Sequence, residues 1–255
     1  MVPQVALTTD IGEGLGRWSL GDDDALLEIV TSANIACGFH GGDPGIMRRT
    51  CALSVKNGVA IGAQVSYRDL HGFGRRYIAM PGDELRDDLL YQIGALDAFC
   101  RAAGVRMQHI KAHGALYNRS VKDEATAEAI AAAVKTYDPG LLFVALPGST
   151  LARAGEAAGL TVAREGFADR AYSPDASLAP RRLPGAVIHE PEVAAERAVR
   201  LVLEGKLTAI DGTELDLEID TLCLHSDTPG AVAIARAIRR RFDEAGITVR
   251  PMLDR

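Results

Sequence analysis

Short apolar runs that are rich in β-branched residues alternate along this chain with longer segments of helical periodicity. Runs of the first kind predict buried strands, and the segments between them predict crossover helices. The expected strands lie at residues 5–9, 33–37, 59–65, 107–112, 141–146, 160–164, 186–189 and 221–225. This alternation is typical of repeated β/α units on a parallel sheet, here with seven or eight strands.

Residues at the ends of the amphipathic segments support the assignment of helices. The expected helices lie at residues 43–57, 83–104, 123–137, 191–205 and 229–246. Asp43-Pro44 and Thr228-Pro229 each offer a capping side chain followed by a proline that suits the first helical position. Glycines that would end helices in the left-handed conformation stand at positions 58, 104, 205 and 246.

No feature of the chain divides it into domains, because it contains no Ser- or Pro-rich linker, no low-complexity tract and no repeat of fixed period. We therefore expect a single β/α barrel that fills residues 1–255. The alternative is an open, doubly wound sheet, which usually carries a glycine-rich nucleotide-binding turn after its first strand. In this chain that turn would contain Asp10 and Glu13, whose charges would repel a pyrophosphate.

Composition and charge narrow the function classes. The 255 residues are 47% apolar and 24% charged, as in ordinary soluble globular proteins. Their net charge of -6 has the wrong sign for binding many phosphates, so no nucleic-acid partner is expected. The chain begins with no secretion signal and contains no membrane-length apolar run, so no membrane partner is expected. The four cysteines form no CxxC pair, which favours a reducing cytoplasm, and Cys37 and Cys223 fit small buried side chains.

Polar residues recur where the predicted strands end. In a parallel barrel these ends meet on one face, where the active site forms. The residues are Asp10 and Glu13, His40 and Asp43, Gln64, Tyr67 and Asp69, Lys111 and His113, Glu165, Asp169 and Arg170, and His225 and Asp227. The sequence therefore predicts an enzyme site at this face of the barrel.

Several of these residues have side chains suited to catalysis. Asp10 fits a general base or a metal ligand, although it could instead cap a loop. His40 lies among glycines that leave its imidazole uncovered. Lys111 could hold an anion while His113, two residues further on, moves protons; alternatively, Lys111 pairs with an acidic residue inside the barrel mouth. His71, His109 and His189 lack such a context and are interpreted as structural or exposed.

An anion site and a metal site are both left open by the sequence. Arg75 and Arg76 are adjacent guanidinium groups on a glycine-containing loop, suited to a carboxylate or phosphate, but a solvated pair fits the spacing equally well. Asp10, His40 and His113 are residue types that bind metals, but their spacing matches no metal motif, so we assign no metal ligand.

Six long segments carry a resemblance to a known family. They are residues 30–40, 72–76, 91–96, 113–118, 167–172 and 225–229, which read VTSANIACGFH, GFGRR, YQIGAL, HGALYN, FADRAY and HSDTP. These segments resemble the LamB/YcsF family, and the match runs from near residue 5 to near residue 250. The resemblance implies a β/α barrel related to polysaccharide deacetylases, acting as a subunit of an ATP-dependent 5-oxoprolinase with two partner subunits of B and C type.

The resemblance also implies roles for the residues at the strand ends. Asp10 or Glu13 would act as general base, Lys111 and His113 would handle the transferred phosphoryl or leaving group, and His40 would join this catalytic set. ATP would be a cosubstrate, and a divalent metal is left open. The expected substrate-binding residues, with Arg75 or Arg76 on the substrate carboxylate, are Asn34, Asp43, Gln64, Arg75, Arg76, Tyr117, Asp169, Arg170, His225 and Asp227.

The chain departs from the family pattern at several strand ends. Thr8 replaces the first asparagine of Asn-x-Asp-Leu-Gly-Glu, and Ala112 and Ser226 replace a proline and a glycine. Where the family commonly has Ala-His-Pro, this chain has Ala63-Gln64-Val65, so a neutral amide replaces an imidazole. These changes favour an altered substrate preference. Two other functions stay open: a metal-dependent deacetylase or amidohydrolase that needs no ATP, and a non-catalytic ligand-binding subunit.

Overall fold

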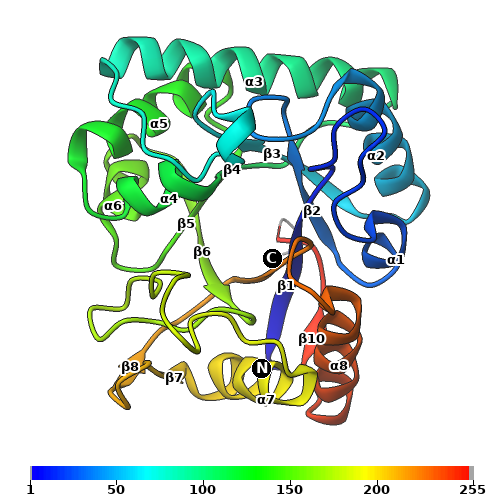
Figure 1. The fold of residues 1–255 in the computed structure, drawn as a ribbon, viewed down its shortest axis with the longest axis vertical. Helices are drawn as coiled ribbons and strands as arrows, with labels where there is room; N and C mark the ends of the chain where they lie inside the picture. Colours follow the sequence, from blue (N-terminus) through cyan, green and yellow to red (C-terminus); the bar gives the residue numbers. More distant parts are fainter. Residues whose placement is uncertain (1, 253–255) are drawn as a thin grey trace.

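The computed structural model describes residues 2–252 and shows a closed barrel of seven parallel strands (Figure 1). The predicted β/α barrel is therefore confirmed. The expected domain bounds of 1–255 include residues 1 and 253–255, which lie outside the described residues. In order around the barrel the strands are β1 (Gln4–Ile11), β2 (Ser32–Ala36), β3 (Ala60–Val65), β4 (His109–Ala112), β5 (Leu142–Ala145), β6 (Thr161–Phe167) and β9 (Thr221–His225).

The barrel closes because the long strand β1 pairs with both β2 and β9. Asp10 lies opposite Asn34 on one side and opposite His225 on the other. The short strand β10 (Thr248–Val249) pairs with Gln4 and Val5 at the start of β1, whereas β2 pairs with β1 only from Thr8 onward. Strand β6 pairs with β5 through its first half and with β9 through its second half. The carboxyl ends of the seven strands consequently meet at one rim.

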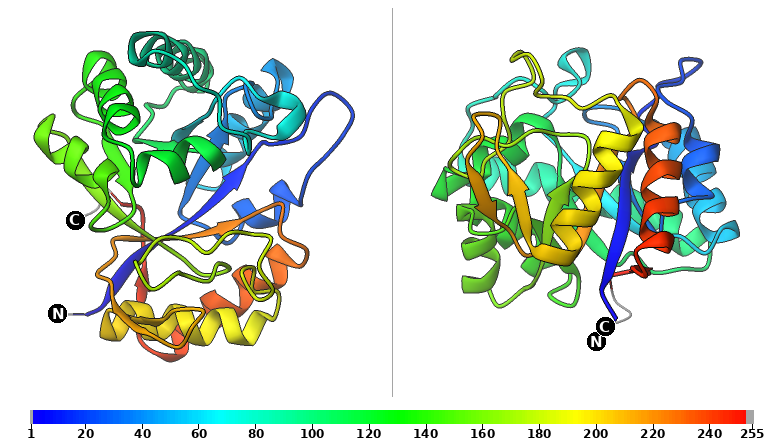
Figure 2. Two further views of the ribbon diagram at one scale, coloured as in Figure 1. Left: turned by 60° about the vertical axis from the view of Figure 1, so that its left-hand side comes forward. Right: turned by 90° about the horizontal axis from the view of Figure 1, so that it is seen from below.

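Helices surround this barrel on the outside (Figures 1 and 2). They are α1 (Asp23–Leu27), α2 (Pro44–Lys56), α3 (Gly82–Ala102), α4 (Gly114–Ser120), α5 (Glu124–Tyr137), α6 (Thr150–Ala157), α7 (Pro191–Glu204), α8 (Ala231–Glu244) and the 3-10 turn η1 (Leu70–Gly72). The apolar faces of the helices and the outer faces of the strands form one continuous hydrophobic core. No helix within residues 2–252 is long and apolar enough to cross a membrane.

The predicted helix ends are mostly confirmed. Asp43 accepts a hydrogen bond from the backbone amide of Ile46 at 2.9 Å, as an N-terminal cap of α2 should. The glycines at 58, 104, 205 and 246 all have positive φ, between 64° and 77°. The cap predicted at Thr228 is wrong, because α8 begins at Ala231 and the Thr228 hydroxyl donates instead to Asp169 at 2.9 Å.

The strand predicted at residues 186–189 is also wrong. This segment belongs to a long loop that joins β6 to α7, and Val187 makes only an isolated bridge to Arg170. Its apolar character comes from packing of the loop on itself, because Ala171, Ala179 and Ala186 form a small buried cluster. The hairpin of β7 (Lys206–Thr208) and β8 (Glu214–Asp216) lies outside the barrel and was not expected, because its three-residue strands are mostly polar.

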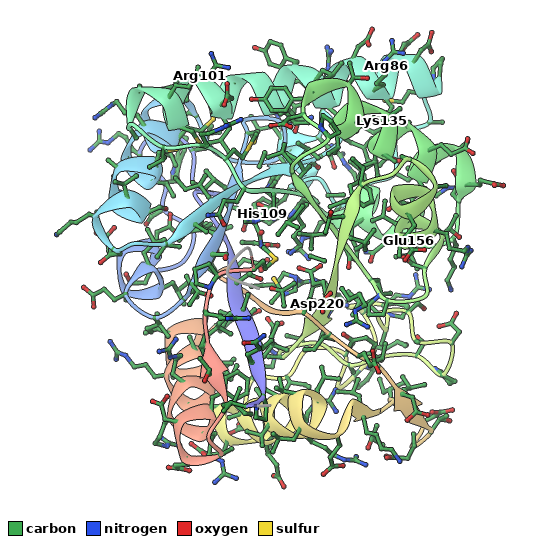
Figure 3. The ribbon with its side chains drawn as sticks, turned by 180° about the vertical axis from the view of Figure 1, so that it is seen from behind. Arg86, Arg101, His109, Lys135, Glu156 and Asp220 are labelled. Carbon is green, nitrogen blue, oxygen red and sulfur yellow. The ribbon has the colours of Figure 1, made fainter. Side chains whose placement is uncertain are left out.

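Buried polar side chains of the strands lie inside the barrel, below the rim where the strands end. His109 lies at the centre of the barrel (Figure 3), where its Nε2 donates to the Asn34 side-chain oxygen at 2.8 Å. A Cβ on Gly62 would lie 2.2 Å from this imidazole, so only glycine leaves room for it. Burial, and then the charge of Lys111, lowers the pKa of His109 to about 3. The ring is therefore neutral and structural, as the sequence indicated.

Candidate active site

A pocket of about 430 Å³ opens at the carboxyl ends of β1, β4, β6 and β9. Helix α4 and the segment before it line the pocket, and so do residues 177–181 of the long β6–α7 loop. Its charged and titratable lining side chains are Asp10, Arg75, Lys111, His113, Tyr117, Lys122, Arg170, Arg181 and His225. Five of these are lysines or arginines and only one is a carboxylate, so the pocket suits an anionic molecule.

The floor of the pocket is an ion pair between Lys111 and Asp10. Lys111 Nζ donates to Asp10 Oδ1 at 2.6 Å and to Cys223 Sγ at 3.1 Å, and it lies 3.2 Å from Glu165 Oε1. Asn34 Nδ2 donates to the same Asp10 oxygen at 2.9 Å. The sequence left open whether Lys111 holds an anion or pairs with an acidic residue. The structure shows the ion pair, and Lys111 also lines the pocket.

Neighbouring charges set the protonation states of Lys111 and Asp10. Burial would lower the pKa of Lys111, but Asp10, Cys223 and Glu165 together raise it well above its ordinary value. Burial would raise the pKa of Asp10, but the charges of Lys111 and His225 outweigh burial and lower it. Burial raises the pKa of Glu165. Lys111 is therefore an ammonium and Asp10 a carboxylate at neutral pH.

A second buried cluster lies behind the His113 wall. Glu13 Oε1 lies 3.2 Å from His40 Nε2 and 3.4 Å from His113 Nδ1. Gln64 bridges the two rings, because its oxygen lies 3.2 Å from His40 Nε2 and its nitrogen 2.9 Å from His113 Nδ1. The rings stack with centroids 3.8 Å apart. The carboxylate that joins the two histidines is thus Glu13, whereas Asp10 is held by Lys111.

The hydrogen bond that His113 Nε2 makes sets the tautomer of this ring. His113 Nε2 donates to the carbonyl of Phe73 at 2.9 Å, which leaves the Nδ1 lone pair facing Glu13 and Gln64. Burial, followed by the nearby His40, lowers the pKa of His113 well below its ordinary value. The Phe73 ring packs edge-on against both imidazoles, and its backbone has a φ of 55°, which is unusual for a residue other than glycine.

Three arginines lie around the pocket with few acidic partners. Arg75 pairs with Asp227, and Arg181 lies 3.9 Å from the same carboxylate. Arg170 donates to the carbonyl oxygens of Ala179 at 2.6 Å and Ala186 at 3.3 Å. Burial and then the Arg181 charge lower the pKa of Arg170 to about 10. Repulsion between the charges of Arg170 and Arg181 contributes to this lowering, and an anion bound in the pocket would offset that repulsion.

Not every predicted site residue reaches the pocket. Arg76 pairs with Asp69, and its side chain is 67% exposed outside the pocket. Asp43 holds the start of α2 and also accepts from the Gly16 amide at 2.8 Å. Asn34, Gln64 and Asp169 are buried behind the lining residues.

Asp169 acts on the pocket through a neighbour. It lies 3.0 Å from His225 Nδ1 and so orients a ring that lines the pocket. Tyr117 lines the pocket directly, and burial together with the adjacent Glu165 charge raises the pKa of its hydroxyl well above the ordinary value.

Three contributors lay outside the expected site. Glu165 directly follows the strand predicted at residues 160–164, but it was not among the proposed catalytic or substrate-binding residues; in the structure it lies inside β6, which continues to Phe167. Cys223 is buried as expected, yet its sulfur contacts Lys111. Arg181 lies in the β6–α7 loop, far from any strand end, so the strand-end pattern could not indicate it.

Comparisons with known proteins agree with one another. Residues 5–255 match the LamB/YcsF family. The A subunit of 5-oxoprolinase from Methylococcus capsulatus is 53% identical over 249 residues, covering 98% of this chain and 96% of the relative. The one from Pyrococcus furiosus is 49% identical over 251 residues, covering 98% of each. The crystal structure of the lactam utilization protein from Thermus thermophilus has a TM-score of 0.92 at 48% identity, covering 97% of this chain and 99% of that one.

Proposed function

This chain belongs to the LamB/YcsF family, and we propose that it is the A subunit of an ATP-dependent 5-oxoprolinase. The reaction opens the cyclic amide of 5-oxoproline and yields L-glutamate, with hydrolysis of ATP to ADP and phosphate. The names of its relatives support this substrate and an assembly of several subunits. We propose partner subunits of B and C type and a cytoplasmic location, which suits the four unpaired cysteines.

The observation that carries the proposal is the cationic pocket above an ion-paired floor. 5-Oxoproline is a five-membered lactam with one carboxylate, so it needs a cationic anchor and, at a distance from it, a group that acts on the amide. Arg75, Arg170 and Arg181 supply the anchor, because a guanidinium binds a carboxylate through two parallel hydrogen bonds. Lys111 and Asp10 at the floor supply the groups that would act on the amide.

Amide resonance makes direct attack by water slow, so the carbonyl oxygen must first be activated. Transfer of the γ-phosphoryl group of ATP to that oxygen gives a phosphorylated imidate and ADP. The Lys111 ammonium, which is buried and stays charged, would stabilise the negative charge on the transferred group. Water then adds to the ring carbon, and the carbon–nitrogen bond breaks as the nitrogen takes up a proton, which opens the ring to γ-glutamyl phosphate. A second water hydrolyses this acyl phosphate to glutamate and phosphate.

Asp10 is the residue we propose to bind and deprotonate the water that adds to the ring carbon. Its hydrogen bonds from Lys111 and Asn34 both go to Oδ1. Oδ2 is therefore the oxygen available to a water in the pocket that Asp10 lines. The lowered pKa of Asp10 keeps it ionised, so its carboxylate can accept a hydrogen bond from this water throughout the neutral range.

The test is to incubate the chain with 5-oxoproline and ATP, alone and with its two candidate partner subunits, and to measure glutamate and ADP. We expect glutamate and ADP in equal amounts from the complete assembly and a large loss of both with Asp10→Asn. Glutamate formed without ATP would favour a metal-dependent amidohydrolase instead. Full activity of an assembly that contains Asp10→Asn together with Lys111→Met would favour a non-catalytic subunit.

A further inference from the structure

The buried cluster of Glu13, His40, Gln64 and His113 is separate from the cationic floor and is not used by the reaction proposed above. Its side chains come from three consecutive strand ends and the loop after β1, and all are nearly inaccessible to solvent. One oxygen or nitrogen atom from each of Glu13, His40 and His113 lies within 4.8 Å of the other two. Carboxylate and imidazole groups that converge inside a protein are typical ligands of divalent transition metals.

The separations between these atoms fit one ion at their centre. An ion bound tetrahedrally at about 2.0–2.1 Å from its ligands keeps neighbouring ligand atoms about 3.3 Å apart. Glu13 Oε1 lies 3.2 Å from His40 Nε2 and 3.4 Å from His113 Nδ1, and the Gln64 oxygen lies 3.2 Å from His40 Nε2. These distances match three of the six edges of a tetrahedron with the Gln64 oxygen at the fourth corner. The Gln64 nitrogen, which donates to His113 Nδ1 at 2.9 Å, would turn away from that ring when the ion binds.

The surroundings of His113 prepare it to bind a metal. Its Nε2 is committed to the Phe73 carbonyl, so the lone pair on Nδ1 points into the cluster. Metal-binding histidines usually donate their other ring nitrogen to a carbonyl or carboxylate in this way. The loop above is tightly packed, because a Cβ on Gly74 would lie 2.8 Å from the His113 ring and 2.9 Å from the His40 Cβ.

The charge of Glu13 also requires a partner. It is 4% exposed, and within residues 2–252 its ion pairs are with His40 and His113, not with a lysine or arginine. Burial of a carboxylate is costly unless it is paired with positive charge or coordinates a metal. A divalent cation would supply that charge.

We propose that Glu13, His40 and His113, with Gln64 as fourth ligand, bind one divalent transition-metal ion per chain in tetrahedral geometry. The ion would link β1, β2, β3 and β4 at the rim, next to the pocket wall that His113 forms. This inference does not rest on the proposed function, and its test measures binding and not turnover.

The experiment uses the untagged full chain, stripped with a chelator and titrated with Co²⁺ and then Zn²⁺. We expect one Co²⁺ per chain, with the intense visible absorption of tetrahedral Co²⁺, and its loss when one equivalent of Zn²⁺ displaces it. Glu13→Gln, which keeps the side-chain shape, and His40→Ala should each weaken binding at least about 100-fold. Gln64→His should shift the Co²⁺ spectrum, because an imidazole replaces an amide oxygen.

The matched control is His189→Ala, which removes an exposed histidine outside the cluster and should bind as the wild type does. Circular dichroism shows whether each variant is folded. The wild-type titration tests the proposal even if a variant does not fold. The proposal is overturned if wild-type protein shows no tetrahedral Co²⁺ spectrum, or if folded Glu13→Gln binds as tightly as wild type. Either result would leave the cluster as a hydrogen-bond network only.

Discussion

Replacement of Arg181 by methionine tests whether the arginines of the pocket hold the substrate carboxylate. Arg181 lines the pocket, its side chain is 29% exposed, and its nearest carboxylate is Asp227 at 3.9 Å. Burial and then the Arg75 charge lower its pKa, so Arg181 lies among like charges in the free protein. The variant should therefore fold with little or no loss of stability.

The expected effect is on substrate binding. A hydrogen bond to a charged group contributes roughly 1.5–3 kcal/mol. This corresponds to a rise in KM for 5-oxoproline of about 10-fold to 150-fold, since 1.4 kcal/mol is a factor of ten. The carboxylate does not react, so the contact is similar in the ground and transition states, and kcat should change little.

The assay is steady-state glutamate formation by the reconstituted assembly, with 5-oxoproline varied at saturating ATP. Arg182→Met is the matched control, because Arg182 is the next residue and is exposed outside the pocket. A lactam that lacks the carboxylate, 2-pyrrolidinone, should lose less with Arg181→Met than 5-oxoproline does. A KM within twofold of wild type, or an equal loss for both lactams, would refute the role of Arg181 as a carboxylate anchor.

Three further predictions concern stability. Lys111→Met should lower the free energy of unfolding by about 3–5 kcal/mol, because it leaves the Asp10 and Glu165 carboxyl groups buried without their ammonium partner; denaturant unfolding measures this, and a loss under 1 kcal/mol would contradict it. Burial opposes ionisation of Asp169, but His225 and Thr228 outweigh burial and lower its pKa to about 2. The ionised carboxylate therefore stabilises the fold fully above the pKa of about 3.9 that Asp has in the unfolded chain, and this stabilisation is lost as the pH falls toward 2. Asp169→Asn should flatten the plot of unfolding free energy against pH between these values, and an unchanged slope of that plot would count against this. Asp43→Ala should cost about 1 kcal/mol through loss of the α2 cap while leaving KM unchanged; a raised KM would instead indicate the substrate contact expected from the sequence.

The repeated β/α pattern was enough to predict the barrel, because each strand is buried on both faces and each helix on one. The strand at 186–189 was mistaken because a loop that packs on itself has the same local apolar pattern as a short strand. The Thr228 cap was mistaken for a similar reason. Its hydroxyl has a stronger partner in Asp169, 59 residues away in the sequence, than in the local backbone.

The strand-end pattern identified most of the polar residues at the rim, but it could not pair them. Asp10 and Lys111 are 101 residues apart, and their contact depends on β1 and β4 facing each other across the barrel. Likewise, the spacing of Arg75 and Arg76 favoured neither over the other. In the folded chain Arg75 lines the pocket, while Asp69 holds Arg76 outside it.

The sequence by itself determined the strands, the main helices and the side of the barrel where chemistry gathers, because these follow from local periodicity and from the common direction of parallel strands. Only the tertiary structure decided which carboxylate meets which cation. It placed Asp10 on Lys111 and Glu13 between His40 and His113, and it brought Arg181 from a distant loop to the pocket. Such pairings depend on distances across the barrel, and a pattern of neighbouring residues contains no information about those distances.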